Sequence, residues 1–197
     1  MQHTLEVIER SVTEKIKSLR SADEKARYVL WTDGDNPLIC FGINPGDPAK
    51  EKSGNTIKAL SEKAQREKFD SWIMLNVYPQ CEPNVNNLHL ESCEVLKEVN
   101  LKQISKVLNE VKGRSSQPLT IWAAWGATMG DKKRRYLQET LRDMVVDLKL
   151  DDEKEYRWVS CGERTKYKHP RHPARVCGAC ALETFNISEY ISELELE

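Results

Sequence analysis

The sequence predicts an α/β fold with three layers, α/β/α, around a central four-stranded, mainly parallel sheet. One further strand is expected at the edge, antiparallel and part of a hairpin. Two observations favour this fold class. Short apolar runs alternate with amphipathic stretches, as in parallel strands joined by crossover helices. The 197 residues have an ordinary globular composition, with 39% hydrophobic and 31% charged residues. We therefore expect a single domain over residues 1–197.

The strands are predicted from apolar runs and from the turn residues that bound them. Residues 27–31 form the first such run, and the segment Asp-Gly-Asp-Asn-Pro at 33–37 is a strong turn signal. This turn predicts a hairpin with a strand over 38–43. Three further apolar runs predict strands over 71–78, 119–125 and 156–160. Residues 27–176 are thus the expected core of the domain.

The helices are predicted from apolar residues at helical spacing. They are expected over residues 2–20, 55–68, 89–112 and 131–148, and the third is left open to a break near Asn100. The N-terminal helix would place Leu5, Ile8, Val12, Ile16 and Leu19 on one face. The acidic tail over 183–197 predicts a solvated terminal helix or strand.

Composition and charge exclude several classes of protein. The net charge of −1 gives the whole molecule no strong attraction for nucleic acid, so contact with a polyanion must be local. No apolar run has the length of a membrane span, and the N-terminus lacks a signal-peptide core. Six cysteines in a chain of this size do not make a disulfide scaffold. We expect a cytoplasmic protein with reduced thiols, no membrane partner and no cofactor.

Most of the unusual residues follow the carboxyl ends of the four predicted parallel strands. The four segments are 42–46, 76–84, 125–130 and 161–175. The carboxyl ends of parallel strands lie at one edge of a sheet, so these segments should converge on one crevice. The candidate site is expected there.

The first two segments offer amide, carboxylate and aromatic side chains. Asn44 lies in a sharp Gly-Ile-Asn-Pro-Gly turn and Asp47 follows it, although both residue types also cap turns. Asn76 ends an apolar strand, and burying its amide without partners would cost ~1–3 kcal/mol. An amide offers a donor and an acceptor, which match the edge of a nucleobase. Tyr78 could stack on that base, with ordinary packing as the alternative.

The fourth segment is a cationic loop that contains two His-Pro dipeptides. It holds five basic residues and two histidines between 164 and 175. We expect phosphate contacts from Lys166, Lys168, Arg171 and Arg175, and an imidazole donor from His169 or His172. A plain exposed loop is the alternative. The basic run at 131–135 is open to the same two interpretations.

The two histidines and a Cys-x-x-Cys pair provide four residues of metal-ligating type. His169, His172, Cys177 and Cys180 have the spacing H-x2-H-x4-C-x2-C. Four residues between the pairs is short for a tetrahedral site, and the flanking prolines restrict the histidines. Two small buried cysteines are therefore the default interpretation, with a zinc site as the alternative.

Four of these motifs together resemble the uracil-DNA glycosylase superfamily. Residues 42–46 are similar to the first motif of the mismatch-specific uracil/thymine glycosylases, whose asparagine positions the attacking water. Leu75-Asn76 resembles the strand end whose asparagine recognises the uracil edge. Residues 124–126 (Ala-Trp-Gly) resemble the third-strand motif. His172-Pro173, or else His169-Pro170, resembles the motif that stabilises the departing base.

A closer resemblance, over most of residues 27–176, is to the domain-of-unknown-function 1643 family of bacteria. The matching features are Arg27-Tyr28-x-Leu30-Trp31, Asn44-Pro45, Asn55-Thr56-Ile57, Asn76, Trp125-Gly126, Thr165-Lys166 and Pro170-Arg171-His172-Pro173. The two resemblances together imply a fold like that of uracil-DNA glycosylase.

The leading hypothesis is a protein that recognises a nucleobase or nucleotide and hydrolyses an N-glycosidic bond in DNA or in a nucleotide. Asn44 would hold the water, Asn76 would recognise the base, and His172, or secondly His169, would stabilise the leaving base. An amide is no general base at neutral pH, so Asp47 would supply the carboxylate. The alternatives are a non-catalytic module that binds a nucleotide or nucleic acid, and thirdly a zinc-stabilised domain.

Overall fold

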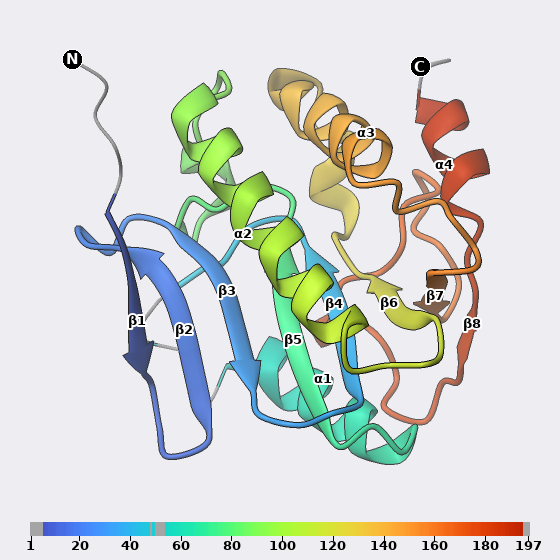
Figure 1. Ribbon diagram of the computed structural model, residues 1–197. Coiled ribbons are helices and arrows are strands. Elements are labelled where there is room, and N and C mark those ends of the chain that lie inside the picture. Colours follow the sequence, from blue (N-terminus) through green and yellow to red (C-terminus); the bar gives the residue numbers. More distant parts are fainter. Residues whose placement is uncertain (1–5, 48, 50–53, 195–197) are drawn as a thin grey trace.

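An eight-stranded mixed sheet runs through the protein in the order β1-β2-β3-β5-β4-β6-β7-β8 (Figure 1). The structure is a computed structural model that describes residues 6–47, 49 and 54–194. The strands are β1 (Val7–Ser11), β2 (Ile16–Ser21), β3 (Arg27–Thr32), β4 (Pro37–Gly42), β5 (Ser71–Asn76), β6 (Leu119–Ala123), β7 (Tyr156–Cys161) and β8 (Leu182–Thr184).

The sheet contradicts the predicted fold of four central strands with one antiparallel edge strand. Of its seven pairings, four are antiparallel: β1–β2, β2–β3, β3–β5 and β7–β8. The pairings β5–β4, β4–β6 and β6–β7 are parallel. The prediction was wrong because it missed β1, β2 and β8, which extend the sheet on both sides.

The predicted hairpin between the strands now labelled β3 and β4 was also wrong. β3 pairs with β5, with Leu30 opposite Met74, and β5 lies between β3 and β4. The turn that follows β3 is fastened to the start of β5, because the two carboxylate oxygens of Asp70 accept the N–H groups of Asp35 and Asn36. Turn residues predict where the chain reverses but not which strand becomes the neighbour.

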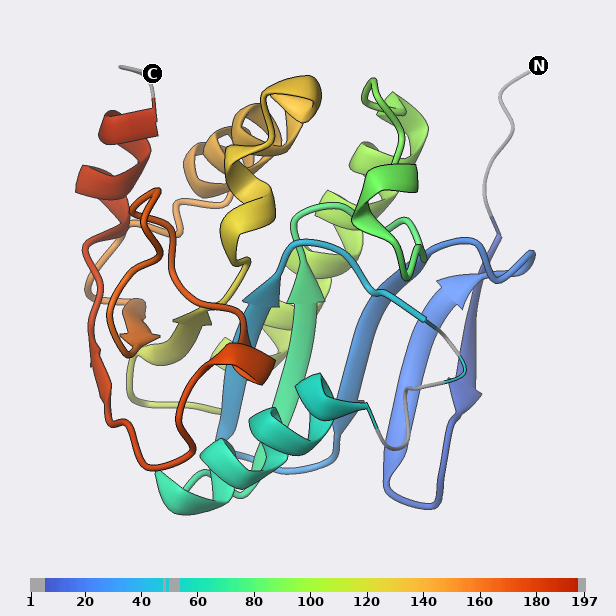
Figure 2. The same cartoon turned by 180° about the vertical axis from the view of Figure 1, so that it is seen from behind.

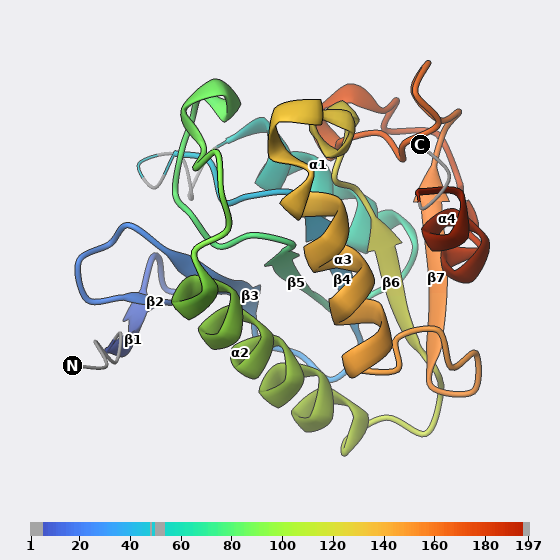
Figure 3. The ribbon, with the colours of Figure 1, turned by 90° about the horizontal axis from the view of Figure 1, so that it is seen from above.

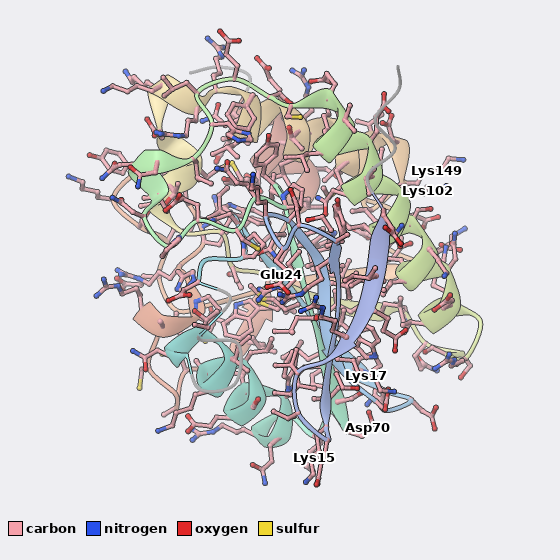
Figure 4. The ribbon with its side chains drawn as sticks, turned by 90° about the vertical axis from the view of Figure 1, so that its left-hand side faces the viewer. Lys15, Lys17, Glu24, Asp70, Lys102 and Lys149 are labelled. Carbon is pink, nitrogen blue, oxygen red and sulfur yellow. The ribbon has the colours of Figure 1, made fainter. Side chains whose placement is uncertain are left out.

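The N-terminal segment predicted as a helix over 2–20 is the β1–β2 hairpin from residue 7 onward, and residues 2–5 lie outside the described residues. Thr13 Oγ1 accepts the N–H groups of Lys15 (3.2 Å) and Ile16 (2.9 Å), which closes a turn in the middle of the segment. Figure 4 shows Lys15 at this turn, at the same end of the sheet as Asp70. The segment is extended because β3 supplies hydrogen-bonding partners for β2.

Helices cover both faces of the sheet (Figures 1, 2 and 3). They are α1 (Asn55–Arg66), α2 (Glu94–Lys112), α3 (Tyr136–Asp147) and α4 (Ile187–Leu194). α1 lies on one face, with α2 and α3 on the other. Successive side chains of β4 enter the two cores alternately: Ile39 packs with residues of α2 and α3, and Cys40 packs with residues of α1.

Two helices differ from their predictions in detail. α2 passes through Asn100 without a break, because the buried Asn100 side chain donates to the carbonyls of Asn76 (2.9 Å) and Val77 (3.2 Å) instead of competing for its own backbone. The tail is not a solvated element, since α4 buries Tyr190 and Leu194 against the core. Among the described residues, none of the helices combines the length and apolar character needed to cross a membrane.

Candidate functional site

A cavity of about 710 Å³ lies at the carboxyl ends of the parallel strands. Its volume is within the range of ~300–1,000 Å³ typical of small-molecule sites. Each of the four strand-end segments contributes to its lining, and the start of α1 and Arg27 complete it. The lining residues are 43–47, 54–57, 82–83, 125–128, Arg27, Met74, Val85, Thr165, Arg171, His172 and Arg175. The parallel topology thus brings segments more than a hundred residues apart into one site.

Asn44 lines the cavity with its side-chain oxygen available as an acceptor. Its Nδ2 donates to the carbonyl oxygens of Glu82 (2.9 Å) and Gln80 (3.3 Å). These two bonds hold the turn after β4 against the segment after β5. Because both amide hydrogens point to main-chain carbonyls, Oδ1 is the atom left to accept a hydrogen bond in the cavity.

Asp47 places a carboxylate in the same cavity. Its Oδ1 accepts the N–H of Ala49 at 2.9 Å, the capping role that its residue type suggests. A carboxylate has several acceptor sites, so one capping bond does not by itself prevent it from accepting others. The cavity therefore has an ionisable acceptor a few residues beyond Asn44.

His172 lines the cavity as a neutral imidazole. Burial, and to a lesser degree the nearby Arg175, lower its pKa to about 4. Its Nδ1 accepts the N–H of Ala174 at 3.2 Å, capping the short 3-10 helix η5 (Pro173–Arg175). The proton of the neutral ring is therefore assigned to Nε2, which is free to act as a donor.

Gly126 positions the segment that holds His172. Its φ of +73° favours glycine, and a Cβ at this position would lie 3.1 Å from the Cβ of His172. Its N–H donates to the carbonyl of Pro170 at 3.0 Å. A side chain here would strain the backbone and press on His172, so the Trp-Gly pair after β6 fixes the His-Pro loop against the sheet.

His169, the other candidate imidazole, lies in the interior and is not a lining residue. It is 2% exposed, and its Nδ1 is 2.8 Å from the hydroxyl of Tyr190. That hydroxyl also accepts the indole N–H of Trp125 at 2.9 Å. The Trp125–Tyr190–His169 chain connects the strand end of β6, α4 and the loop. The structure thus separates the two His-Pro dipeptides: one is in the core and one is in the cavity.

Asn76 is fully buried beside the cavity and does not line it. Strand alternation puts its side chain on the face of β5 that carries Met74, a lining residue. A Cβ at Gly42 would lie 2.9 Å from Asn76 Oδ1, so this glycine makes room for the amide. Neither Nδ2 nor Oδ1 has a hydrogen-bond partner among the described residues. A buried amide in this state is destabilising by ~1–3 kcal/mol.

Tyr78, the candidate stacking residue, packs in the core with α2 and α3 and is not brought to the cavity. Its hydroxyl accepts the N–H of Cys93 at 3.0 Å and lies 2.9 Å from Nδ1 of His89. Burial raises its pKa to about 12. Its ring meets Tyr136 edge-on at 5.1 Å between centroids.

Three arginines line the cavity, one of which sequence reasoning missed. Arg171 and Arg175 were expected; Lys166 and Lys168 are exposed residues of the same loop outside the lining. The missed residue is Arg27, which is 3% exposed and donates from Nη2 to the carbonyl of Pro45 at 3.4 Å. An arginine at the start of an otherwise apolar strand was the signal that could have found it.

The N-terminus of α1 is a further part of the site that the sequence did not single out. Residues 54–57 line the cavity, and the N-cap is Gly54, which has no side chain to cap the helix. The first turn has no acidic residue, while Lys63 and Arg66 lie in the last turn. The partial positive charge of the helix end and its N–H groups therefore favour an anion in the cavity.

The Cys-x-x-Cys pair follows η5 in the chain and does not line the cavity. Cys177 is exposed, contrary to the expectation of two buried cysteines, and Cys180 is partly buried. The backbone N–H of Ala179 lowers the pKa of the Cys177 thiol. Within the part of the chain that the structure describes, no three His, Cys, Asp or Glu side chains gather closely enough to hold a metal ion.

A comparison with curated proteins and with solved structures found no match to this chain. A family model described as "Protein of unknown function (DUF1643)" matches residues 27–174. The matched region begins at the first residue of β3 and ends inside η5. It contains every lining residue of the cavity except Arg175. Because the match covers well over half of the chain, the protein belongs to the DUF1643 family.

Proposed function

We propose that the cavity binds a nucleotide, free or within a strand, and hydrolyses its N-glycosidic bond. One observation carries the proposal: Asn44, Asp47 and His172 line a single cavity that also contains three arginines. Asn44 supplies an acceptor for water, Asp47 a carboxylate and His172 a neutral hydrogen-bond donor. The arginines supply positive charge. The similarity of residues 42–46 and 172–173 to uracil-DNA glycosylase motifs supports this choice of reaction.

The phosphate of the ligand is held on the cationic side of the cavity. Arg27, Arg171 and Arg175 and the N-terminus of α1 make up this side. Arg27 is buried, so its interaction with an anion is screened less by water than that of a surface cation. Arg171 is oriented by its own bond, since its Nε donates to the carbonyl of Glu163 at 2.7 Å. A guanidinium in that position can offer its remaining N–H groups to phosphate oxygens.

Hydrolysis requires a water beside the sugar carbon that carries the base. Asn44 Oδ1 accepts a hydrogen bond from this water and so orients it, because its amide hydrogens are already used by Gln80 and Glu82. The water oxygen bonds to C1′ as the C1′–N bond breaks. Asp47 is the group that accepts the released proton, since an amide cannot.

The electron pair of the broken bond goes to the departing base. His172 donates a hydrogen bond from Nε2 to the base atom on which this charge collects, and keeps its proton throughout. A neutral imidazole suits that role, because burial keeps the pKa of His172 at about 4. Fixed donors aimed at developing charge in a site sheltered from water stabilise a transition state without reorganising.

The test is release of free base from oligonucleotides that contain uracil, hypoxanthine or a thymine mismatch, and from the corresponding nucleosides and nucleotides. We expect release by the wild-type protein and a loss of ~100-fold or more in Asn44→Ala and Asp47→Ala. Asn109→Ala, which changes an exposed asparagine of α2, is the matched control and should retain full activity.

Binding measured with the same ligands by calorimetry separates the two parts of the proposal. Ligand binding without base release from any substrate would overturn the hydrolase and leave a non-catalytic binding module. If the protein binds none of these nucleotides or oligonucleotides, the proposed function is overturned as a whole.

A further inference from the structure

The loop between β7 and η5 carries an exposed turn that starts from Thr165, a residue of the cavity lining. The N–H of Thr165 donates to the carbonyl of His169 at 2.8 Å, and the N–H of Lys168 donates to the carbonyl of Thr165 at 2.8 Å. Thr165 Oγ1 also accepts the N–H of His169 at 3.2 Å. Residues 166–168 are therefore the tip of a closed turn. Its base is fastened at Thr165, which lines the cavity, and at the buried His169.

Tyr167 occupies the tip with its ring in solvent. It is 55% exposed, and it is the one aromatic residue among the exposed large hydrophobic side chains of the described residues. Lys166 Nζ lies 4.6 Å from the centroid of the ring. Lys168 has a φ of +63°, which is uncommon for a residue with a side chain. The turn thus presents an aromatic ring flanked by two cations, two residues along the chain from Thr165 in the lining of the cavity.

We infer that the substrate is a single-stranded polynucleotide, one nucleotide of which enters the cavity while a neighbouring base stacks on Tyr167. This inference rests on the proposed function. Lys166 and Lys168 meet the phosphates on either side of the stacked base. Aromatic rings bordered by cations are the usual means of binding single strands without sequence preference, because every base has a stacking face.

The charge of the loop matches this partner. Segment 163–175 contains five lysines and arginines and one acidic residue, Glu163, in a chain whose net charge is −1. The attraction for a polyanion must therefore be local, and this loop is one place that supplies it. A free nucleotide is held by the arginines of the cavity alone, whereas a strand also reaches the tip of the turn.

A single strand also suits this turn better than a duplex does. Extruding a base from a duplex costs unpairing and unstacking, and proteins that do so commonly fill the gap with an apolar side chain. The tip of this turn has a tyrosine between two lysines, which suits a base that is already unstacked.

The experiment measures binding by fluorescence anisotropy of a labelled single strand of about twelve nucleotides, as DNA and as RNA. The matched duplex and a nucleoside monophosphate, both unlabelled, are added as competitors that displace the labelled strand. We expect the single strand to bind at least ~10-fold more tightly than the monophosphate. Tyr167→Ala should weaken strand binding by about five- to a hundredfold and leave monophosphate binding unchanged. Tyr167→Phe keeps the ring and should bind the strand as the wild type does.

Lys102→Ala is the control for a general loss of positive charge, because Lys102 is exposed on α2 (Figure 4), on the opposite face of the sheet from α1. It should leave strand binding unchanged. Strand binding that is no tighter than monophosphate binding, that is indifferent to Tyr167→Ala, or that is weaker than duplex binding would overturn the inference. In each case base release from nucleotides could still stand, so failure of the inference is distinguishable from failure of the proposed function.

Discussion

The two ends of the parallel strands carry similar turn residues that have different roles. At the amino end of β4 and β5, the carboxylate of Asp70 accepts the N–H groups of Asp35 (3.0 Å) and Asn36 (2.9 Å) and the hydroxyl of Ser71 (2.7 Å). At the carboxyl end, Asn44 is also bound to main chain, yet its Oδ1 remains available in the cavity. Turn-forming asparagines and aspartates therefore mark a site only where the turns leave atoms unused.

Space alone does not account for this difference. A hollow of about 940 Å³ lies near the amino end and includes Asp70 and Ser71 in its lining. Thr32, another of its lining residues, accepts the N–H of Trp72 on Oγ1 at 3.1 Å. These polar groups serve the connections between strands. The cavity at the carboxyl end adds what the other hollow lacks in its lining: arginines, a neutral histidine and a helix N-terminus.

The largest expected effect separates the two histidines of the loop. His172→Ala should lower base release by ~100- to 10,000-fold, because the ring acts as a donor in the cavity. It should lower the melting temperature only slightly, since the one backbone bond that the ring makes caps the short helix η5. His169→Ala should instead lower the melting temperature by several degrees, since it removes the buried partner of Tyr190. Activity assays and thermal melts of both variants check this. Equal loss of activity in two folded variants would contradict the assigned roles.

A second prediction concerns two buried asparagines, Asn76 and Asn100, which meet at the end of β5. Asn100→Ala should destabilise the protein by ~1–3 kcal/mol, because the carbonyls of Asn76 and Val77 lose their donor. Asn76→Ala should leave stability unchanged or raise it, since the buried amide has no partner among the described residues. Urea unfolding measures both.

Nucleotide binding to the Asn76→Ala protein decides what the amide does. Weaker binding at unchanged stability would show that the amide takes part in recognition of the base. Marked destabilisation by Asn76→Ala would contradict the view that this amide is unsatisfied in the folded protein.

A smaller effect is expected at the amino end of the sheet. Asp70→Ala should cost about 1 kcal/mol, because the residue is exposed and water replaces part of the lost hydrogen bonding. Nucleotide binding and base release should not change. Denaturant titration measures the change in stability, and the base-release assay measures activity. A loss of activity without a loss of stability would contradict the distinction between the amino and carboxyl ends of the parallel strands.

The last expected effect appears only at acidic pH and is a pH dependence from His172. Its pKa of about 4 in the folded protein lies below the ordinary value of 6.5, so the unfolded chain takes up this proton first. Stability should therefore fall as the pH is lowered from 6.5 toward 4, and this part of the fall should be absent in His172→Gln. Urea midpoints of both proteins across this range measure it. An identical pH dependence in the two proteins would contradict a neutral, half-buried imidazole at this position.

Much of the secondary structure was predictable because local patterns determine it. The apolar runs at β3 to β7 are bounded by turn residues, and α1, α2 and α3 show helical spacing. The β1–β2 segment was not predictable in this way, since its apolar residues fit a helix as well as a hairpin. The short β8 has three residues and pairs with β7, which no local pattern indicates.

The candidate site was predictable to a similar extent. Its location followed from the rule that parallel strands end at one edge, and Asn44, Asp47, His172, Arg171 and Arg175 do line one cavity. Arg27 was missed because the search for a site covered only the segments that follow the parallel strands. The antiparallel β3 begins near the carboxyl ends of those strands, and its first residue therefore also lines the cavity. The separation of His169 from His172 depends on Tyr190, in a helix that the sequence left undefined.

The sequence by itself determined the positions of the central strands, the turns between them and the set of polar residues at their ends. These are local properties, controlled by hydrophobic periodicity and backbone preference. Only the tertiary structure decided the strand order, the extra strands and which of two similar histidines faces the cavity. Such choices depend on contacts between residues distant in the chain, such as those of Asp70 with Asn36 and of His169 with Tyr190.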